Sequence, residues 1–410
     1  MMKNIVLVLS LIAGVFSPLA AQFFDSRKNE PANLTAGKST YQWAIKKMIL
    51  QTTNNIRPYI VKGGSTLQAD TIIYDSEKDI GYAYSNVEFD NPKKGMVLTA
   101  GQGTYFSQKQ EVYVKEHPFV KMAKEKTTAR SDTMTIYNDR DYIVLIGHVV
   151  IRNVSNLITG QKATYYSKTG RFIVVSNARA IQNDLTVKGD LIDMTVLDGD
   201  IQNYVADGNV YLENKKDGYN LTAGKMDYDK KIGFTRLSDH PSVNMSEAGT
   251  TNQNTHMTAD RIDLNTDTNG KMKSYTAIGN VHVRDLKEGY VIDSGRLDYY
   301  NAKGYAKITQ KPVIHFEGRK MDAYALTMER YDREKKANLL GDVRIVQEGK
   351  IAYSRWAEYR TAERKMTMTG NPIIVEGESR WKTQKVVVDV DTGVMDMIGN
   401  GQGVFQYQMQ

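Results

Sequence analysis

Histidine and aspartate are the side chains of this sequence best suited to chemistry. The chain has six His and no Cys in 410 residues, so a catalytic acid–base pair or a metal site would need His together with carboxylates. Four aspartates, Asp70, Asp132, Asp190 and Asp260, each follow a small residue in a recurring pattern. An active site needs one place where polar groups converge and differ from their surroundings. Recurrence at equivalent positions instead predicts a role in turns.

Most of the histidines also recur at equivalent positions of the pattern, which again predicts a structural role. His117, His148 and His240 occupy equivalent turn positions, and two more come shortly after such turns. The sequence has no H-E-x-x-H, G-x-S-x-G or Walker-type motif. The glycine-rich run at 399–403 is the last of the turns, with no helix after it to bind phosphate. We therefore predict that the protein is not an enzyme and has no catalytic residue, no metal and no cofactor.

The recurring pattern organises the whole chain. It occurs eleven times, about every 30 residues, in forms such as LQADTIIY at 67–74 and LTAGKMDY at 221–228. Each copy has a small or short anchor residue, an apolar residue two before it and an apolar residue five after it. The anchors are Ala69, Ala100, Ser131, Gly160, Gly189, Ala223, Ala259, Ser294, Ala323, Ser354 and Thr383. This period indicates stacked repeats, each of which buries its apolar face only against its neighbours.

A turn lies between successive anchors and takes two forms. One form resembles Gly-Asn-Val, as at 208–210 and 279–281, and the other has proline at the same place, as at Pro241. Gly, Asn and Asp tolerate positive φ and proline fixes φ near about −65°, so both forms are chain corners. Apolar residues alternate after the corner, for example at Val281 and Val283, which indicates strands.

The spacing around the anchor predicts a bend in each strand. Apolar side chains at positions −2, +3 and +5 share one face only if one extra residue is absorbed near positions 0 to +2. A bulge absorbs such a residue, and Ala, Ser or Gly suits the crowded backbone there. We therefore predict an all-β fold, an elongated open β-jellyroll stack of about 22 strands, two from each repeat of about 30 residues, with two facing sheets around an apolar groove.

The composition of the interior bears on what fills it. The chain contains 18 Met and 25 Tyr, and flexible, polarizable methionine suits variable apolar ligands. This favours a groove that holds lipid. The alternative is a structural or adhesive β-solenoid with a dry core that binds protein partners through its outer faces. By position in the repeat, the predicted groove-lining residues are Ile72, Tyr74, Val87, Phe89, Tyr105, Ile136, Ile151, Tyr165, Val210, Leu212, Met226, Tyr228, Ile262, Val283, Leu297, Tyr299 and Ile345.

The N-terminus has the layout of a secretion signal. Lys3 precedes an apolar run at 5–16, and the sequence SPLAA follows at 17–21. We predict a cleaved signal peptide at 1–21, and the alternative is an uncleaved N-terminal anchor. The absence of Cys excludes a lipid-modified cysteine anchor and disulfides. These features predict an extracytoplasmic location.

The rest of the chain divides into a short segment and a repeat domain. Residues 22–62 are predicted to be partly helical around 43–50, where they would cover the first strand. Residues 34–41 resemble the anchor pattern, so an extra degenerate strand is the alternative. The repeat domain is predicted to cover 63–410. The net charge of +7 is spread along the chain, which disfavours nucleic acid as a partner.

The anchor pattern and the alternating G-N-V and K-P or H-P corners resemble the OstA/LptA-like family of periplasmic lipopolysaccharide-transport proteins. The most similar stretches are 221–228, 278–283 and 311–314, and the resemblance covers about residues 64–405. It implies a β-jellyroll with a V-shaped apolar groove that holds lipid acyl chains. The implied function is a periplasmic carrier or bridge that shields acyl chains of lipopolysaccharide or a related glycolipid on the way to the outer membrane.

The resemblance also implies partners. Jellyrolls of this family join edge to edge into a bridge between the inner and outer membranes. The C-terminal strands, from about 386 onward, have no capping helix or proline, and unpaired strand edges invite another strand. We expect edge-strand pairing with other jellyroll export proteins or head-to-tail self-association.

Overall fold

A computed structural model describes residues 32–404 except positions 63, 93–94, 124–125, 138–139, 153–155, 167, 183–184, 198–199, 216–217, 247–252, 268–271 and 318–319. The predicted signal peptide at 1–21 lies outside the described residues. Within them the chain divides into an N-terminal unit that ends at Val210 and a C-terminal unit that begins at Tyr211. The one helical element described is a 3-10 turn, η1 (Trp43–Ile45). No helix in the described ranges is long and apolar enough to span a membrane.

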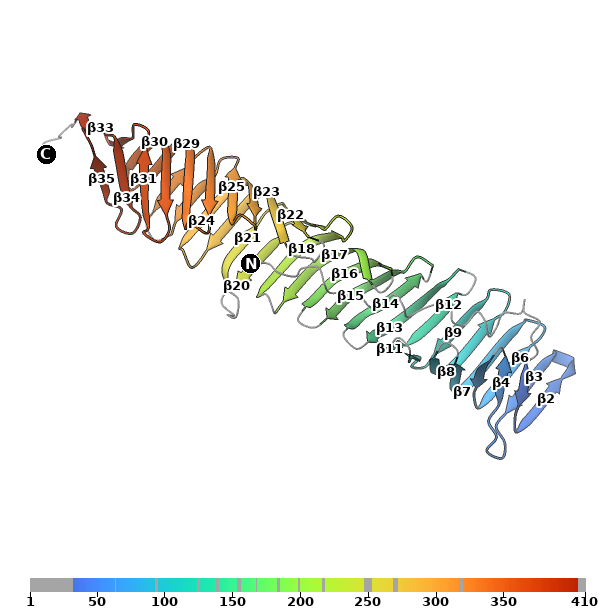
Figure 1. Cartoon of the computed structure of the whole chain (residues 1–410). Helices are drawn as coiled ribbons and strands as arrows, with labels where there is room; N and C mark the ends of the chain where they lie inside the picture. Colours follow the sequence, from blue (N-terminus) through green and yellow to red (C-terminus); the bar gives the residue numbers. More distant parts are fainter. Residues whose placement is uncertain are drawn as a thin grey trace. The chain divides into compact units, whose positions relative to one another are not determined.

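Both units consist of antiparallel strands that lie side by side in sequence order within each unit (Figure 1). The strands of the N-terminal unit are β1 (Asn33–Thr35), β2 (Lys38–Gln42), β3 (Lys47–Gln51), β4 (Tyr59–Lys62), β5 (Ser65–Gln68), β6 (Thr71–Asp75), β7 (Ile80–Asn91), β8 (Met96–Phe106), β9 (Glu111–Lys115), β10 (Phe119–Met122), β11 (Thr127–Arg130), β12 (Thr133–Tyr137), β13 (Tyr142–Arg152), β14 (Asn156–Tyr166), β15 (Arg171–Gln182) and β16 (Leu185–Leu197). Strand β17 (Asp200–Asn214) crosses the boundary between the units.

The strands of the C-terminal unit are β18 (Tyr219–Asp229), β19 (Phe234–Ser238), β20 (Ser242–Ser246), β21 (Gln253–Thr258), β22 (Arg261–Thr266), β23 (Met272–Asp285), β24 (Tyr290–Tyr300), β25 (Tyr305–Thr309), β26 (Val313–Phe316), β27 (Met321–Tyr324), β28 (Thr327–Tyr331), β29 (Lys336–Gln347), β30 (Lys350–Arg360), β31 (Lys365–Thr369), β32 (Ile373–Glu376), β33 (Ser379–Lys382), β34 (Lys385–Asp389), β35 (Met395–Ile398) and β36 (Gln402–Val404).

Each long strand contributes to two sheets. The first half of β7, from Ile80 to Tyr84, pairs with β6, and its second half, after Val87, pairs with β5. In the N-terminal unit we call the sheet that contains β2, β3, β6, β9 and β12 the first wall. The sheet that contains β1, β4, β5, β10 and β11 is the second wall. Strands such as β7, β8 and β13 bend from one wall to the other and join the two walls along one side.

The C-terminal unit repeats this arrangement. Its first wall contains β19, β22, β25, β28, β31, β34 and β35. Its second wall contains β20, β21, β26, β27, β32, β33 and β36. Strands β18, β23, β24, β29 and β30 belong to both walls. Two facing sheets with strands that bend between them confirm the predicted all-β jellyroll class.

The described strands number 36, where the sequence predicts about 22. The difference arises because many bent strands are interrupted at the bend. Strands β9 and β10, for example, are two halves of one bent segment separated by the corner at Pro118. From β5 to β36, twelve described strands run through the bend and the other twenty are the halves of ten. The number of bent segments therefore agrees with the prediction of about 22. A bent segment is divided into two strands where proline or the anchor residue interrupts the hydrogen bonds to the neighbouring strand.

The register shows the predicted bulge. Between β7 and β8 the cross-strand partners step from Tyr84 with Gln102 to Val87 with Ala100. This step leaves Gly101, directly after the anchor Ala100, out of the ladder on one strand and two corner residues out on the other. The side of the strand that is buried changes at this point, so the expected extra residue near the anchor is confirmed.

The aspartates after the anchors hold the corners. Asn209 Nδ2 donates to Asp190 at 2.9 Å, and Asn280 Nδ2 donates to Asp260 at 3.1 Å. Both asparagines have positive φ, which asparagine adopts at lower cost than most residues. The predicted turn role of these aspartates is therefore confirmed.

The proline corners differ from expectation in one respect. Glu116 and His117, the two residues before Pro118, both have positive φ, at 64° and 59°. The left-handed pair thus precedes the proline, and it is built from residues without a strong preference for that conformation. Repeated packing of the neighbouring strands imposes this backbone, because the same pair recurs before Pro241 and Pro312.

The segment at 32–62 forms strands and not the expected helix over 43–50. Only η1 is helical, and β3 follows it directly and pairs with β6. Trp43 is 82% exposed, so it does not cover the first strand. The alternative is one extra degenerate strand, and the structure shows two bent segments: β1 and β2 form the first, and β3 and β4 form the next.

One copy of the repeat lies two residues later than its sequence pattern suggests. The pattern places its anchor at Ala323, but in the other copies that follow a proline corner the anchor amide donates to the carbonyl of that proline, as Ala69 does to Pro58. Ala325 N makes this hydrogen bond to Pro312 O at 3.4 Å. Ala325 is therefore the anchor, and the residue five after it is Arg330.

Candidate functional site

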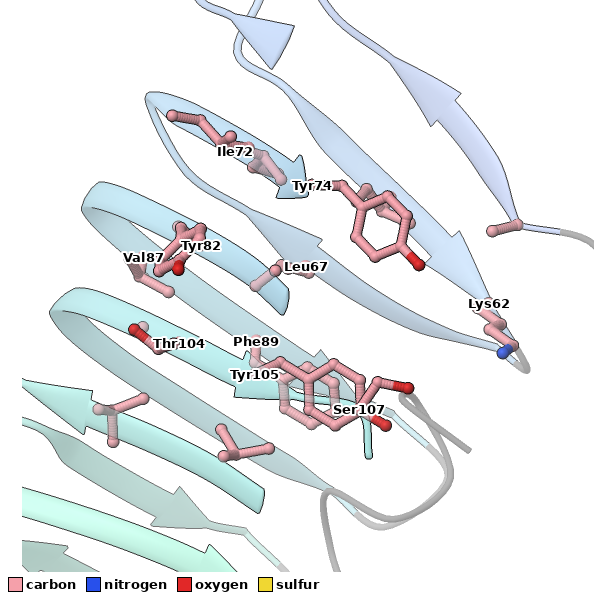
Figure 2. A pocket seen from close by; sticks show the side chains of 18 of the residues that line it. Lys62, Leu67, Ile72, Tyr74, Tyr82, Val87, Phe89, Thr104, Tyr105 and Ser107 are labelled. Atoms are coloured by element: carbon pink, nitrogen blue, oxygen red, sulfur yellow. The ribbon is translucent and has the colours of Figure 1, made fainter. Parts of the chain in front are cut away.

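An apolar cavity of about 440 Å³ lies between the two walls of the N-terminal unit. Leu67 and Phe89 line it from the second wall, and Ile72, Tyr74 and Tyr105 line it from the first wall (Figure 2). Its lining runs from the β1–β4 end as far as Ile136 on β12. The space therefore follows the stack across several repeats, as a groove for an extended apolar molecule would.

Small residues on the first wall leave room for this cavity. Gly81, Ala83 and Gly103 face it at positions that carry larger side chains elsewhere in the stack, such as Leu145 and Val174. A Cβ atom at Gly103 would lie 3.6 Å from a methyl of Val114, an ordinary van der Waals distance. The backbone at Gly103 therefore tolerates a side chain, and the missing side chain contributes directly to the space.

The mouth of the cavity is polar. Tyr74 Oη donates to Asp79 Oδ1 at 2.7 Å, and Lys62 and Ser107 lie at the strand ends of the second and first walls (Figure 2). Partial burial, together with the Asp79 carboxylate, raises the pKa of the Tyr74 phenol to about 12. The mouth thus combines an apolar interior with neutral and charged groups at its rim, a pattern suited to an amphiphile.

Six of the seventeen residues predicted to line the groove line this cavity: Ile72, Tyr74, Val87, Phe89, Tyr105 and Ile136. Five of them are buried, whereas Tyr74 is 37% exposed because it stands at the mouth. The structure therefore brings together, in one cavity, six of the side chains predicted from their position in the repeat.

The other eleven predicted residues belong to the packed interior between the walls. Ten are buried: Ile151, Tyr165, Val210, Leu212, Met226, Tyr228, Ile262, Val283, Leu297 and Ile345. The eleventh, Tyr299, is partly exposed and donates from its hydroxyl to Asp332 Oδ2 at 3.0 Å. None of these eleven side chains lines the cavity described above, so their contact with lipid stays a prediction.

Several lining residues fall in the segment that the sequence assigns to a partly helical cap. Leu34, Met48 and Ile60 line the cavity from β1, β3 and β4. The resemblance of residues 34–41 to the anchor pattern is the signal that could have identified them. The helical periodicity around 43–50 misleads because tertiary pairing with β6 overrides it.

Several histidines pair with aspartates on neighbouring segments of the chain. Among the described residues no group of His, Asp and Glu is arranged to hold a metal ion. His315 illustrates their role: its Nδ1 lies 2.8 Å from Asp322 and its Nε2 lies 3.1 Å from Asp293, both on neighbouring strands. These are cross-strand pairs on a partly exposed sheet face, which stabilise the sheet.

Comparison with known proteins gives one family and several solved structures. A family model described as lipopolysaccharide-assembly, LptC-related, matches residues 67–183 and 195–348. One of the solved structures is the crystal structure of LptH, described as the LptA-homologous periplasmic component of the lipopolysaccharide transport device from Pseudomonas aeruginosa. It is 14% identical, and the match covers 47% of this chain and 99% of that chain at a TM-score of 0.17. A match at this TM-score supports no further comparison. No curated protein matched the chain.

The family match covers well over half of the chain and contains the anchors and corners that suggested the resemblance. It includes most of the cavity-lining strands from β5 onward. The chain belongs to the LptC-related lipopolysaccharide-assembly family, whose members are non-enzymatic proteins of lipopolysaccharide transport in the periplasm.

Proposed function

We propose that this protein is a periplasmic carrier that shields the acyl chains of lipopolysaccharide or a related glycolipid between its two walls. The apolar cavity of about 440 Å³ in the N-terminal unit is the observation that carries this proposal. Family membership supports it, because lipopolysaccharide assembly requires an apolar molecule to cross an aqueous compartment. The predicted signal sequence at 1–21 supports the same location.

The size of the cavity suits an acyl chain. An engineered cavity of about 150 Å³ holds one benzene molecule, so this cavity has room for on the order of 15 carbons. Each buried methylene contributes about 0.8 kcal/mol, so even a partly inserted chain is held without covalent chemistry. The polar rim leaves a headgroup in water.

A photo-crosslinker tests this proposal directly. Phe89 faces the cavity, whereas its neighbour Glu88 is exposed on the opposite side of β7. With benzoylphenylalanine at position 89, we expect crosslinks to lipopolysaccharide in cells, and with the same group at position 88 we expect none. Benzoylphenylalanine keeps the phenyl ring of Phe89 and adds a benzoyl group, for which the cavity of about 440 Å³ provides space, and circular dichroism checks that the strands are intact. Equal labelling at both positions, or none at either, contradicts the carrier.

The second candidate is a structural β-solenoid with a dry core. The deep burial of interior residues beyond the cavity favours it, for example Leu145 and Phe172. A crosslinker at Phe89 distinguishes the two, because the solenoid labels no lipid there, and a crosslinker at Phe172 shows whether the lipid of a carrier extends beyond the cavity. Native mass spectrometry of the purified protein gives an independent answer: bound glycolipid supports the carrier, and its consistent absence supports the solenoid.

The exposed strand edges support assembly with a partner. In the described part of the chain, β35 pairs only with β34 and β36 only with β33. Met397, Ile398 and Val404 on these strands are about half exposed or more. Unpaired backbone groups beside apolar side chains form a template for another strand. We propose that this edge pairs with another jellyroll of the export machinery or with the opposite end of a second copy.

Charged residues at this edge should prevent pairing. We expect the wild type to form concentration-dependent assemblies in analytical ultracentrifugation, and Met397→Lys with Val404→Lys to remain monomeric, because lysine disfavours edge pairing. Removal of 394–410 should have the same effect. Ile232→Lys, at an exposed residue away from this edge, is the control and should assemble normally. Normal assembly of both edge variants contradicts the proposal.

A further inference from the structure

Arg330 breaks the apolar row of the groove. In the corrected repeat frame it stands five residues after its anchor. The other ten copies have an apolar or aromatic residue at that position: Tyr74, Tyr105, Ile136, Tyr165, Met194, Tyr228, Leu264, Tyr299, Tyr359 and Val388. Arg330 follows the buried Met328 on the same face of β28, so its side chain emerges between the walls. Burying a cation in an otherwise apolar row costs free energy unless the cation is paired, so we expect Arg330 to have a specific role.

The Arg330 guanidinium joins the two walls across the mouth of the groove. Its Nη1 donates to the Tyr290 hydroxyl on the second wall and lies 3.9 Å from Asp285 Oδ2. On its own wall its Nε lies 2.8 Å from Asp332 Oδ1. Arg364 adds a second bridge, because its Nη1 donates to the carbonyl of Glu288 at 3.1 Å. We call these cross-wall contacts the clasp.

A positively charged hollow lies directly outside the clasp. It measures about 290 Å³ and is lined from both walls. Its basic side chains are Lys287, Arg330, Lys335 and Lys336, and its acidic ones are Glu288 and Asp332. Arg330 is 34% exposed, so its guanidinium is reachable from this hollow. An anion that enters meets one guanidinium and three ammonium groups beside the carboxylates of Glu288 and Asp332, and one of the ammonium groups, that of Lys336, is paired with Glu334 at 2.6 Å.

The interior beneath the clasp is closed, but one of its buried polar groups lacks a hydrogen-bond partner among the described residues. A space of about 20 Å³ lies there, lined by Tyr290, Met328, Arg330 and Tyr359 among others. The Tyr359 hydroxyl is buried, and it has no hydrogen-bond partner among the described residues. A buried hydroxyl without a partner is unusual and is expected where a polar group binds in another state. Tyr359 and Arg330 line the same small space, and the charged groups that act on the Tyr359 hydroxyl include Arg364 and Glu288 of the clasp.

We propose that this rung is a site for a phosphate-type anion of the carried lipid, at which Arg330 exchanges Tyr290 and Asp285 for the phosphate and thereby opens the clasp. The inference rests on the proposed carrier function. A bidentate ion pair with phosphate is stronger than a single hydrogen bond to the uncharged Tyr290 hydroxyl together with a contact to Asp285 at 3.9 Å, so the exchange is favourable. Once Arg330 turns to the phosphate, the Arg364 bridge is the part of the clasp that remains at the mouth, the walls separate there while the bent strands still join them on the other side, and the acyl chain gains access to the interior.

The chain allows a clean test because it has no native cysteine. Spin labels are attached at Leu286→Cys on an exposed turn of the second wall and at Glu363→Cys on an exposed turn of the first wall. Double electron–electron resonance then measures the distance between the two labels. The ligands are dodecyl phosphate, dodecyl maltoside and inorganic phosphate, which separate the headgroup from the chain. Arg330→Met tests the cation, since the other copies show that the position accepts an apolar residue. Arg344→Met, whose guanidinium lies over Tyr324 on the outer face, is the control.

We expect dodecyl phosphate to lengthen the label distance in the wild type and in Arg344→Met, and to bind at least tenfold more tightly than dodecyl maltoside. In Arg330→Met the distance should be long or broad without ligand, and the preference for the phosphate head should disappear. Equal affinity for both amphiphiles, or unchanged distances in Arg330→Met, overturns the proposal. Equal effects of inorganic phosphate alone overturn the lipid assignment.

The outcome of this experiment is independent of the outcome of the crosslinking experiment that tests the carrier proposal. The clasp and its anion preference are measured in the C-terminal unit, whereas the carrier is tested by crosslinking at Phe89 in the N-terminal unit. Crosslinks at Phe89 with no headgroup preference leave the carrier intact and remove the anion site. Absent crosslinks with a retained phosphate preference contradict the carrier and leave an anion site without lipid cargo.

Discussion

Gly103→Trp should weaken lipid binding about 100-fold without unfolding the protein. Gly103 faces the cavity from β8, and a Cβ atom at this position meets only ordinary van der Waals contacts. An indole there would take the place of about four methylenes of the ligand. At about 0.8 kcal/mol for each methylene, the loss is about 3 kcal/mol of binding free energy. Titration with a fluorescent fatty acid measures the change in Kd.

Thr99→Trp is the matched control for this variant. Thr99 lies on the same strand but does not line the cavity. The same large side chain there should leave the Kd unchanged, and circular dichroism should show intact strands in both variants. If Gly103→Trp binds the fatty acid as tightly as the wild type, the cavity is not the binding site and the carrier proposal loses its main support.

Phe172→Ala should destabilise the N-terminal unit by about 3–5 kcal/mol. The Phe172 side chain is 1% exposed, and its ring centroid lies 6.3 Å from that of Tyr165 on the neighbouring strand. Removal of a ring from a packed interior loses its burial and leaves a cavity, with a cost in this range. Denaturant unfolding followed by circular dichroism measures the shift of the midpoint.

Arg171→Ala, one residue earlier on β15, provides the comparison. Its guanidinium lies 2.9 Å and 2.5 Å from the two oxygens of Asp193 on the outer face, where about half of its side chain is exposed. A surface ion pair of this kind contributes about 1 kcal/mol or less. A cost for Phe172→Ala as small as that for Arg171→Ala would mean that the walls are not packed together at this repeat in solution.

The two results together separate a local pocket from a continuous groove. A large effect at Gly103 with a large cost at Phe172 places the lipid in the described cavity, with the walls closed beyond it. A large effect at Gly103 with a small cost at Phe172 indicates that the walls open along the N-terminal unit. The second outcome favours the longer groove that the repeat pattern predicts.

The sequence by itself determined the class of fold and the unit that builds it. Periodicity, anchors and corners depend only on local preferences, namely positive φ, small residues at a crowded bend and alternation along strands. These rules hold in ten of the eleven copies, so the bulge beside Ala100 and the turn role of Asp260 could be predicted. The inward row was also predictable, because a bend after each anchor fixes which side chains share a face.

Tertiary structure alone decided where the interior is open. Glycine at positions 81 and 103 creates space only because the opposite wall does not fill it, and no local rule states how far apart the walls lie. The strands formed by residues 32–62 are a second case, since pairing of β3 with β6 overrides the helical character of the sequence. Arg330 is the third. The sequence cannot distinguish the two candidate anchors of this copy, because positions 323 and 325 are both alanine. The hydrogen bond from Ala325 N to Pro312 O identifies Ala325 as the anchor and so places Arg330 in the groove.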